Sequence, residues 1–148
     1  MSPRQDGTPV LRHVRNVRWQ FAPELTPDFL FSASAAGLFL SLRYHLLHPT
    51  YVVERLKQIR SSYRLRVLMC HVDVADPVAS LGDVNRAALA GEATLVCAFS
   101  LEEAGRYLET FKVSETSTNA SLPINCLRPP LIRRGVGYTC PEVHIDLW

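Results

Sequence analysis

The sequence lacks several features that would point directly to a class of protein. Its most apolar window, residues 30–42, is interrupted by serines and a glycine and is too short to cross a membrane. It has no glycine-rich phosphate loop, and its four cysteines show no pair at metal-ligand spacing. Cys70 and Cys97 lie in apolar, strand-like runs, and we interpret them as buried thiols. These absences argue against a helical membrane protein, a P-loop enzyme and a zinc module.

Lysine is also scarce, because only Lys57 and Lys112 are lysines among the 16 basic residues. The first 66 residues hold ten basic and four acidic side chains, whereas residues 67–115 hold three and eight. Arginine has a planar guanidinium that pairs well with phosphates and carboxylates. A basic first half therefore favours a polyanionic partner. With 47% hydrophobic and 20% charged residues in 148, the chain is expected to fold as one packed domain.

Hydrophobic periodicity predicts alternating strands and helices. Strands are expected over residues 10–19, 28–31, 38–45, 65–74 and 94–99. Helices are expected to begin near Pro49, at Asp76 and at Ser100, which forms a capping box with Glu103. This order predicts an α/β fold with a mixed central sheet flanked by helices. The pattern stops near Glu115, so we expect a folded domain over 1–115 and a poorly ordered tail over 116–148.

Acidic residues offer two candidate catalytic groups. Asp28 follows a proline and precedes a strand, which is where several nuclease folds place a metal ligand. A hard cation needs two or more oxygen ligands, however, and no acidic residue lies between Asp28 and Glu54. Asp73 and Asp76 could form a carboxylate pair at the end of a strand. We favour the simpler interpretation that Asp76 caps the next helix and Asp73 is one strand-end acid.

Histidine and serine offer weaker candidates. His45 and His48 are three residues apart, but they flank a strand end and no third zinc ligand is evident. Ser41 and His45 could join Asp28 in a hydrolase triad, but no nucleophile elbow supports this and Ser41 lies within the expected strand. We therefore expect no catalytic residues, no metal site and no cofactor.

A binding surface is the remaining candidate. Phe39, Ser41 and Arg43 share one face of an expected strand, with Tyr44 and Tyr51 nearby in the sequence. Arginine, tyrosine and phenylalanine are typical of binding hot spots, and they also stack on bases and pair with phosphates. The alternative is that Phe39 and Tyr51 belong to the core and that Arg43 is a solvated strand end.

Four segments carry a resemblance to a known family: "PVLRHVRNVRWQF", "PDFLFSASAAGLFLSLRYHLLHPTYVVERL", "LRVLMCHVDVADP" and "EEAGRYLETFK". They closely resemble the central domain of the excision-repair cross-complementing group one family, the catalytically inactive partners of the XPF nuclease. The resemblance covers residues 2–112. It implies a restriction-endonuclease-like, XPF-type fold whose catalytic site is lost.

The resemblance also implies partners in nucleotide excision repair. A vacated nuclease groove would bind a glycine-rich segment of the XPA scaffold, and the domain would bind single-stranded or junction DNA in the nucleus. The implied groove residues are Arg4, Pro9, Phe39, Ser41, Arg43, Tyr44 and Tyr51. The implied DNA contacts are basic residues of the first half: Arg12, Arg15, Arg18, Arg55, Lys57 and Arg60.

Two alternatives remain open at the level of sequence. The tandem helix-hairpin-helix motifs through which the family pairs with XPF are expected to be absent, because residues after Glu115 do not resemble the family. The chain could then be a truncated variant without independent function. The other alternative is a metal-dependent nuclease that uses Asp28.

Overall fold

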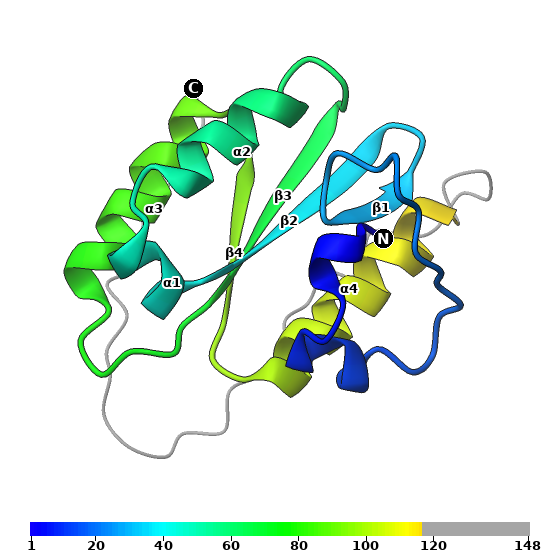
Figure 1. Ribbon diagram of the computed structural model, residues 1–148, viewed down its shortest axis with the longest axis horizontal. Coiled ribbons are helices and arrows are strands. Elements are labelled where there is room, and N and C mark those ends of the chain that lie inside the picture. The colour runs from blue at the N-terminus through cyan, green and yellow to red at the C-terminus, as the bar shows by residue number, and fades with distance from the viewer. Residues whose placement is uncertain (117–148) are drawn as a thin grey trace, which may run out of the picture.

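A computed structural model describes residues 1–116 (Figure 1). The elements in chain order are η1 (Pro3–Gln5), η2 (Pro9–His13), β1 (Phe29–Ser32), β2 (Ala35–Ser41), α1 (Leu42–Leu47), α2 (Tyr51–Ile59), β3 (Leu65–His71), α3 (Val78–Ala90), β4 (Thr94–Ala98) and α4 (Leu101–Thr116). The predicted tail lies outside the described residues, apart from Thr116 at the end of α4. Within residues 1–116, no helix has the length and apolarity needed to cross a bilayer.

The four strands form one mixed sheet in the order β1-β2-β3-β4. Strand β1 pairs with β2 in antiparallel fashion, and the other pairs are parallel. Each parallel connection passes through a helix, as a parallel crossover requires. The register places Phe39 beside Met69, and Met69 beside Val96. The predicted mixed sheet is confirmed.

Helices cover both faces of the sheet (Figure 1). Leu38, Leu40 and Leu68 point toward the face covered by α1, α2 and α3, where they form one buried cluster with Leu56 and Val84. The alternate positions of the same strands pack toward α4 and the N-terminal segment; these are Ala35, Val67 and Met69, which cluster with Ala104 and Leu108. Because side chains alternate along a strand, the near-continuous apolar runs supply both faces.

The predicted capping box at Ser100 is confirmed, whereas the N-cap of α3 is Pro77 and not Asp76, and α2 begins at Tyr51 after the N-cap Thr50. The Ser100 hydroxyl accepts the Glu103 N–H at 3.1 Å, and the Glu103 carboxylate accepts the N–H of Phe99 at 2.8 Å. The Asp76 carboxylate accepts the Val78 N–H at 3.4 Å at the start of α3. Both aspartate and serine thus satisfy donors that a helix leaves unpaired at its first turn.

The prediction of a strand over residues 10–19 is wrong. Pro9 begins the short helix η2, and the chain then continues without regular structure. The reason is that the buried Glu109 carboxylate accepts the backbone N–H groups of Arg15 and Asn16, at 2.5 and 2.7 Å. Those donors are therefore not available for a sheet. Gly105 allows the close approach, since a Cβ there would lie 2.7 Å from the His13 Cβ.

The predicted strand over 38–45 also ends early, at Ser41. The Ser41 hydroxyl accepts the Tyr44 N–H at 3.2 Å, and the Asp73 carboxylate accepts the Arg43 N–H at 2.8 Å. These two acceptors satisfy the first turn of α1, so Arg43 and Tyr44 lie on a helix and not on the strand.

Candidate partner-binding site

Asp28 lies at the start of the edge strand β1 and is only 1% exposed. Its carboxylate accepts the Phe39 N–H at 2.9 Å through one oxygen and the Arg55 guanidinium at 2.9 Å through the other. Arg55, on α2, is itself 5% exposed. The guanidinium therefore supplies the positive charge that a metal ion would otherwise bring to a buried aspartate. Arg55 also donates to the Thr26 carbonyl at 2.9 Å.

The N-terminal segment lies against this pair. The Ser2 N–H donates to the Asp28 carbonyl at 2.9 Å. The predicted groove residue Arg4 donates to the Thr26 carbonyl at 3.3 Å. The same carbonyl also accepts a hydrogen bond from Arg55. Pro9 is exposed at the start of η2, next to the buried Val10, whose cluster also contacts Phe39. The structure thus brings Arg4 beside Asp28.

Aromatic side chains gather where α1 meets α2. Tyr44 is 42% exposed, and its ring centroid lies 4.6 Å from that of His48 and 5.1 Å from that of Tyr51. Tyr51 is half-buried, and burial followed by the Asp28 charge raises the pKa of its hydroxyl. The Tyr44 and Tyr51 rings meet edge to face, and such an aromatic cluster can hold a peptide backbone or an aromatic side chain.

Asp73 organises the other side of the site. Its carboxylate accepts the Ser41 hydroxyl at 2.6 Å and the Arg43 N–H at 2.8 Å, and its carbonyl accepts the Arg43 guanidinium at 3.0 Å. Burial alone would raise the pKa of Asp73, but these hydrogen bonds hold that pKa below its usual value. The His71 ring lies nearly parallel to that of Phe39, with centroids 6.5 Å apart. Asp73 therefore fixes two of the predicted contact residues.

The sequence pattern indicates Asp73 only as one strand-end acid. The sequence held a signal that Asp73 lies near Ser41, because the carboxyl ends of adjacent parallel strands meet at one edge of the sheet. Ser41 ends β2 and Asp73 follows β3, and β2 pairs with β3. His48 was weighed only as a zinc ligand, whereas the structure places its ring against Tyr44.

The weaker catalytic candidates find no support in the geometry. The Ser41 hydroxyl donates to Asp73, and His45 is 4% exposed, with no hydrogen-bond partner for its Nδ1. No cluster of three or more possible metal ligands occurs within residues 1–116. The crevice beside Asp28, lined by Phe39, Tyr51 and Arg55 among others, has no room for a water molecule. A ligand would therefore lie across this surface and not inside it.

We use the name "Tyr44 surface" for Phe39, Ser41, Arg43, Tyr44 and Tyr51, with Arg4 and Pro9 on the N-terminal segment. Hydrogen bonds through Asp73 and Ser41 link Arg43 and Tyr44, and the Tyr44 ring contacts that of Tyr51. The Phe39 side chain instead packs toward the α4-side cluster, on the opposite face of β2 from Tyr51. The alternative in which Phe39 and Tyr51 lie in the core holds only in part, because both are half-buried.

The predicted DNA contacts fall into different environments. Arg12, Arg15, Arg18 and Lys57 are exposed. Arg55 is not a surface residue, and this corrects its assignment to a DNA face, because its guanidinium is buried against Asp28. Arg60 is exposed but pairs with the Glu92 carboxylate at 2.5 Å.

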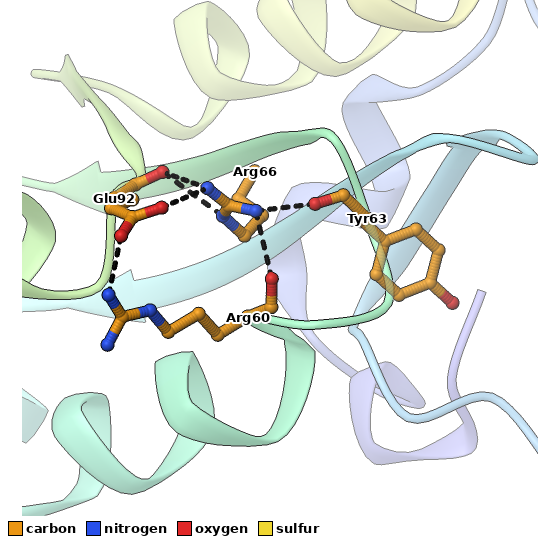
Figure 2. A network of polar contacts seen from close by, with 4 residues as sticks. All are labelled: Arg60, Tyr63, Arg66 and Glu92. Carbon is orange, nitrogen blue, oxygen red and sulfur yellow. Dashed lines mark hydrogen bonds and ion pairs between the residues drawn. The ribbon is translucent and has the colours of Figure 1, made fainter.

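Arg60 belongs to a network at the amino-terminal ends of β3 and β4 (Figure 2). The Arg66 guanidinium donates to the backbone carbonyls of Arg60, Tyr63 and Glu92, at 2.9, 2.5 and 2.9 Å. The hydrogen bond from Arg60, and then its charge, lower the pKa of Glu92. Much of the positive charge of Arg60 is therefore matched within the chain itself.

Comparison with known proteins places this chain in a family. Residues 1–118 match the model described as the binding domain of DNA repair protein Ercc1 (rad10/Swi10). The chain is 47% identical over 115 residues to DNA excision repair protein ERCC-1 of Arabidopsis thaliana, covering 78% of this chain and 28% of that protein. It is 43% identical over 120 residues to mating-type switching protein swi10 of Schizosaccharomyces pombe, covering 81% and 47%. The chain thus spans less than half the length of these two relatives.

The fold is shared with a nuclease. The solved structure of XPF from Aeropyrum pernix matches with a TM-score of 0.64 at 12% identity, covering 78% of this chain and 63% of that one. This likeness confirms the predicted XPF-type fold. With the match over residues 1–118, the chain belongs to the Rad10/Ercc1/Swi10 family.

Proposed function

We propose that this chain is a non-enzymatic adaptor in DNA repair, whose nuclease-type fold carries a partner-binding surface in place of a metal site. The observation that carries this proposal is the buried Arg55–Asp28 pair. Both oxygens of Asp28 already accept hydrogen bonds from the chain, and the guanidinium balances its charge. A magnesium ion would have to displace Arg55 and would still need further oxygen ligands.

The role in repair rests on the family. The Arabidopsis relative is named a DNA excision repair protein, the family model describes a domain of a DNA repair protein, and the fold is that of XPF. We propose that the chain supports incision by an XPF-type nuclease in nucleotide excision repair, in the nucleus, and that it binds single-stranded or junction DNA through a basic face. The test is incision of a splayed-arm DNA by the nuclease subunit with and without this chain. No increase in incision would contradict the supporting role.

The Tyr44 surface is proposed to bind the glycine-rich segment of an XPA-type scaffold. Glycine residues let a peptide backbone approach aromatic rings closely, and an exposed arginine can bind backbone carbonyls or carboxylates. Tyr44 and Arg43 lie at the exposed rim of this surface. Hot spots of this composition carry most of the binding energy of an interface.

Calorimetric titration of the glycine-rich XPA peptide tests this assignment. Tyr44→Ala and Arg43→Ala are each expected to weaken binding at least about tenfold. Arg86→Ala is the matched control, because Arg86 is equally exposed but lies on α3. Unchanged affinity in both variants would show that the peptide binds elsewhere or not at all.

The alternative of a metal-dependent nuclease has its own test. Magnesium-dependent cutting of a splayed-arm DNA by the purified chain, abolished by Asp28→Asn, would overturn the adaptor proposal. We expect no such cutting, since Arg55 holds the carboxylate of Asp28.

A further inference from the structure

The structure separates two faces that could bind DNA. On α2, Arg55 is buried against Asp28, and Arg60, directly after the helix, is paired with Glu92. Lys57 is the exposed predicted contact that remains without such a pair. The segment that follows η2 carries Arg15 and Arg18 in exposed positions, with Arg12 in η2 itself. Phosphate binding depends on accessible positive charge. The N-terminal segment therefore offers the stronger phosphate-binding face.

Exposed aromatic rings lie on this same segment. Trp19 is 42% exposed and Phe21 is 39% exposed, and their ring centroids are 5.4 Å apart in an edge-to-face arrangement. Leu30 of the edge strand β1 is 39% exposed as well. Tryptophan is an effective stacking partner for unpaired bases, since every base presents a π-face.

A cavity of about 420 Å³ opens beside Trp19. Its apolar wall includes Val14, Val17, Phe29 and Leu108, and its two basic lining residues are Arg18 and Lys112. None of its lining residues is acidic. This volume is in the range of small-ligand pockets and can hold a nucleotide-sized group. An apolar wall with basic side chains at its edge fits a base inside and a phosphate at the opening.

The segment is held in place before any ligand binds. The Glu109 carboxylate accepts the N–H groups of Arg15 and Asn16 and the Asn16 side-chain amide, the last at 2.8 Å. Lys112 donates to the Phe31 carbonyl at 2.7 Å, at the cavity edge. Fixing these groups in the free protein reduces the entropy that binding would cost.

We infer that the segment 12–21 and its cavity form the single-stranded DNA site of this chain, with Trp19 stacking on an unpaired base and Arg15 and Arg18 contacting phosphates. The inference rests on the proposed DNA binding and specifies where and how it occurs. A peptide partner is the competing occupant. Three exposed arginines within residues 12–18, followed by the exposed Trp19, favour nucleic acid, because each nucleotide of a single strand carries a phosphate and a base that can stack.

Tryptophan emission gives a direct readout. The chain has two tryptophans, so Trp148→Phe leaves Trp19 as the sole emitter. Adding a single-stranded oligothymidine to this full-length variant is expected to quench the emission, with the midpoint at the Kd measured by the anisotropy of a labelled oligonucleotide. Anisotropy that rises while the Trp19 emission stays constant would overturn the inference and leave DNA binding intact.

Substitutions provide a second test of the inferred DNA site. Trp19→Ala is expected to weaken oligothymidine binding about tenfold. Arg18→Ala is expected to weaken it and to reduce the slope of log affinity against log salt by about 1. The control is Lys57→Ala on the other face, for which no change is expected. Thermal unfolding of each variant shows that it is folded.

The outcomes separate the inference from the proposed function. Binding that is lost on Lys57→Ala but kept in Trp19→Ala and Arg18→Ala would overturn the inference and place DNA on α2. Absence of oligothymidine binding by the unmodified chain would contradict the proposed DNA binding itself, and the inference with it.

Discussion

Helix α2 and the residue that follows it supply two arginine–carboxylate pairs that differ in almost every physical respect. Arg55 and Asp28 have side chains that are 6% and 1% exposed, whereas those of Arg60 and Glu92 are 54% and 58% exposed. The first pair lies under the Tyr44 surface, and the second closes the network in Figure 2. The two arginines are only five residues apart in the sequence.

The difference shows that burial, and not residue type, decides what a basic residue does. A buried pair must recover the cost of removing both ions from water, and Arg55 does so with further hydrogen bonds to Thr26 and Gln58, at 2.9 and 2.7 Å. An exposed pair gains little, because water and salt screen it. Arg55 is therefore held inside the fold as the charge partner of Asp28, while Arg60 remains a surface residue.

Removal of Arg55 is expected to have the largest effect on stability. Arg55→Ala leaves the Asp28 carboxylate buried and unpaired, which costs about 3–5 kcal/mol of the free energy of unfolding. Urea denaturation measures the loss. The double variant Asp28→Ala/Arg55→Ala should lose less than the sum of the two single variants, since it leaves no uncompensated charge. If Arg55→Ala lost no more free energy of unfolding than Arg60→Ala, this would contradict the contrast between the buried and the exposed pair.

Glu109 extends the comparison to a buried carboxylate that binds N–H groups and not an arginine side chain. Glu109→Gln is expected to cost about 1.5–3 kcal/mol, the range for hydrogen bonds to a charged group. The N–H of Asn16, ahead of the opposing effect of burial, lowers the pKa of Glu109 in the folded state. Its stabilising contribution is therefore complete above an ordinary carboxyl pKa of about 4.3 and is lost as the pH falls through the lowered value.

Acid denaturation of Glu109→Gln against the unmodified chain tests this sign. The stability difference between the two proteins should be constant near neutral pH and shrink below about pH 4. A difference that grows toward low pH would show that the carboxylate is not the form that binds the Arg15–Asn16 turn.

The prediction for Asp73 concerns the affinity for the peptide and not the free energy of unfolding. Asp73→Ala removes the acceptor that fixes Ser41 and Arg43, so the XPA peptide should bind about tenfold more weakly. Asp73→Asn, which keeps one acceptor oxygen, should recover part of the affinity. Calorimetry that finds equal affinity in all three proteins would remove Asp73 from the binding site.

Arg60→Ala is expected to have the smallest effect on the free energy of unfolding, because its pair is exposed and screened by water. The same variant in high salt should lose even less, since salt screens the pair in the unmodified chain. A loss comparable to that of Arg55→Ala would mean that the network in Figure 2 is a main source of stability.

Sequence reasoning predicted the sheet and the helices that follow strong periodicity. The apolar runs of β3 and β4 and the capping box of α4 are local signals, and the structure confirms them. It failed at 10–19, where the competing acceptor is Glu109, more than ninety residues away. It also ended β2 too late, because one of the two acceptors that begin α1 is Asp73, which follows the neighbouring strand β3.

The candidate site was also predictable from the sequence only in part. The residue types of the Tyr44 surface and the absence of an acid after Asp28 were visible in the sequence. The partner of Asp28 was not, because Arg55 reads as one basic residue among several on an amphipathic helix. Only the fold shows that its guanidinium turns inward.

The most direct test of the central claim is an amide NMR titration of the full chain with the glycine-rich XPA peptide, followed by magnesium. The account predicts shifts concentrated over residues 39–51 with the peptide, and no shift at Asp28 or Phe39 with magnesium. Magnesium-dependent shifts at Asp28, with no response of residues 39–51 to the peptide, would contradict it and restore a metal site.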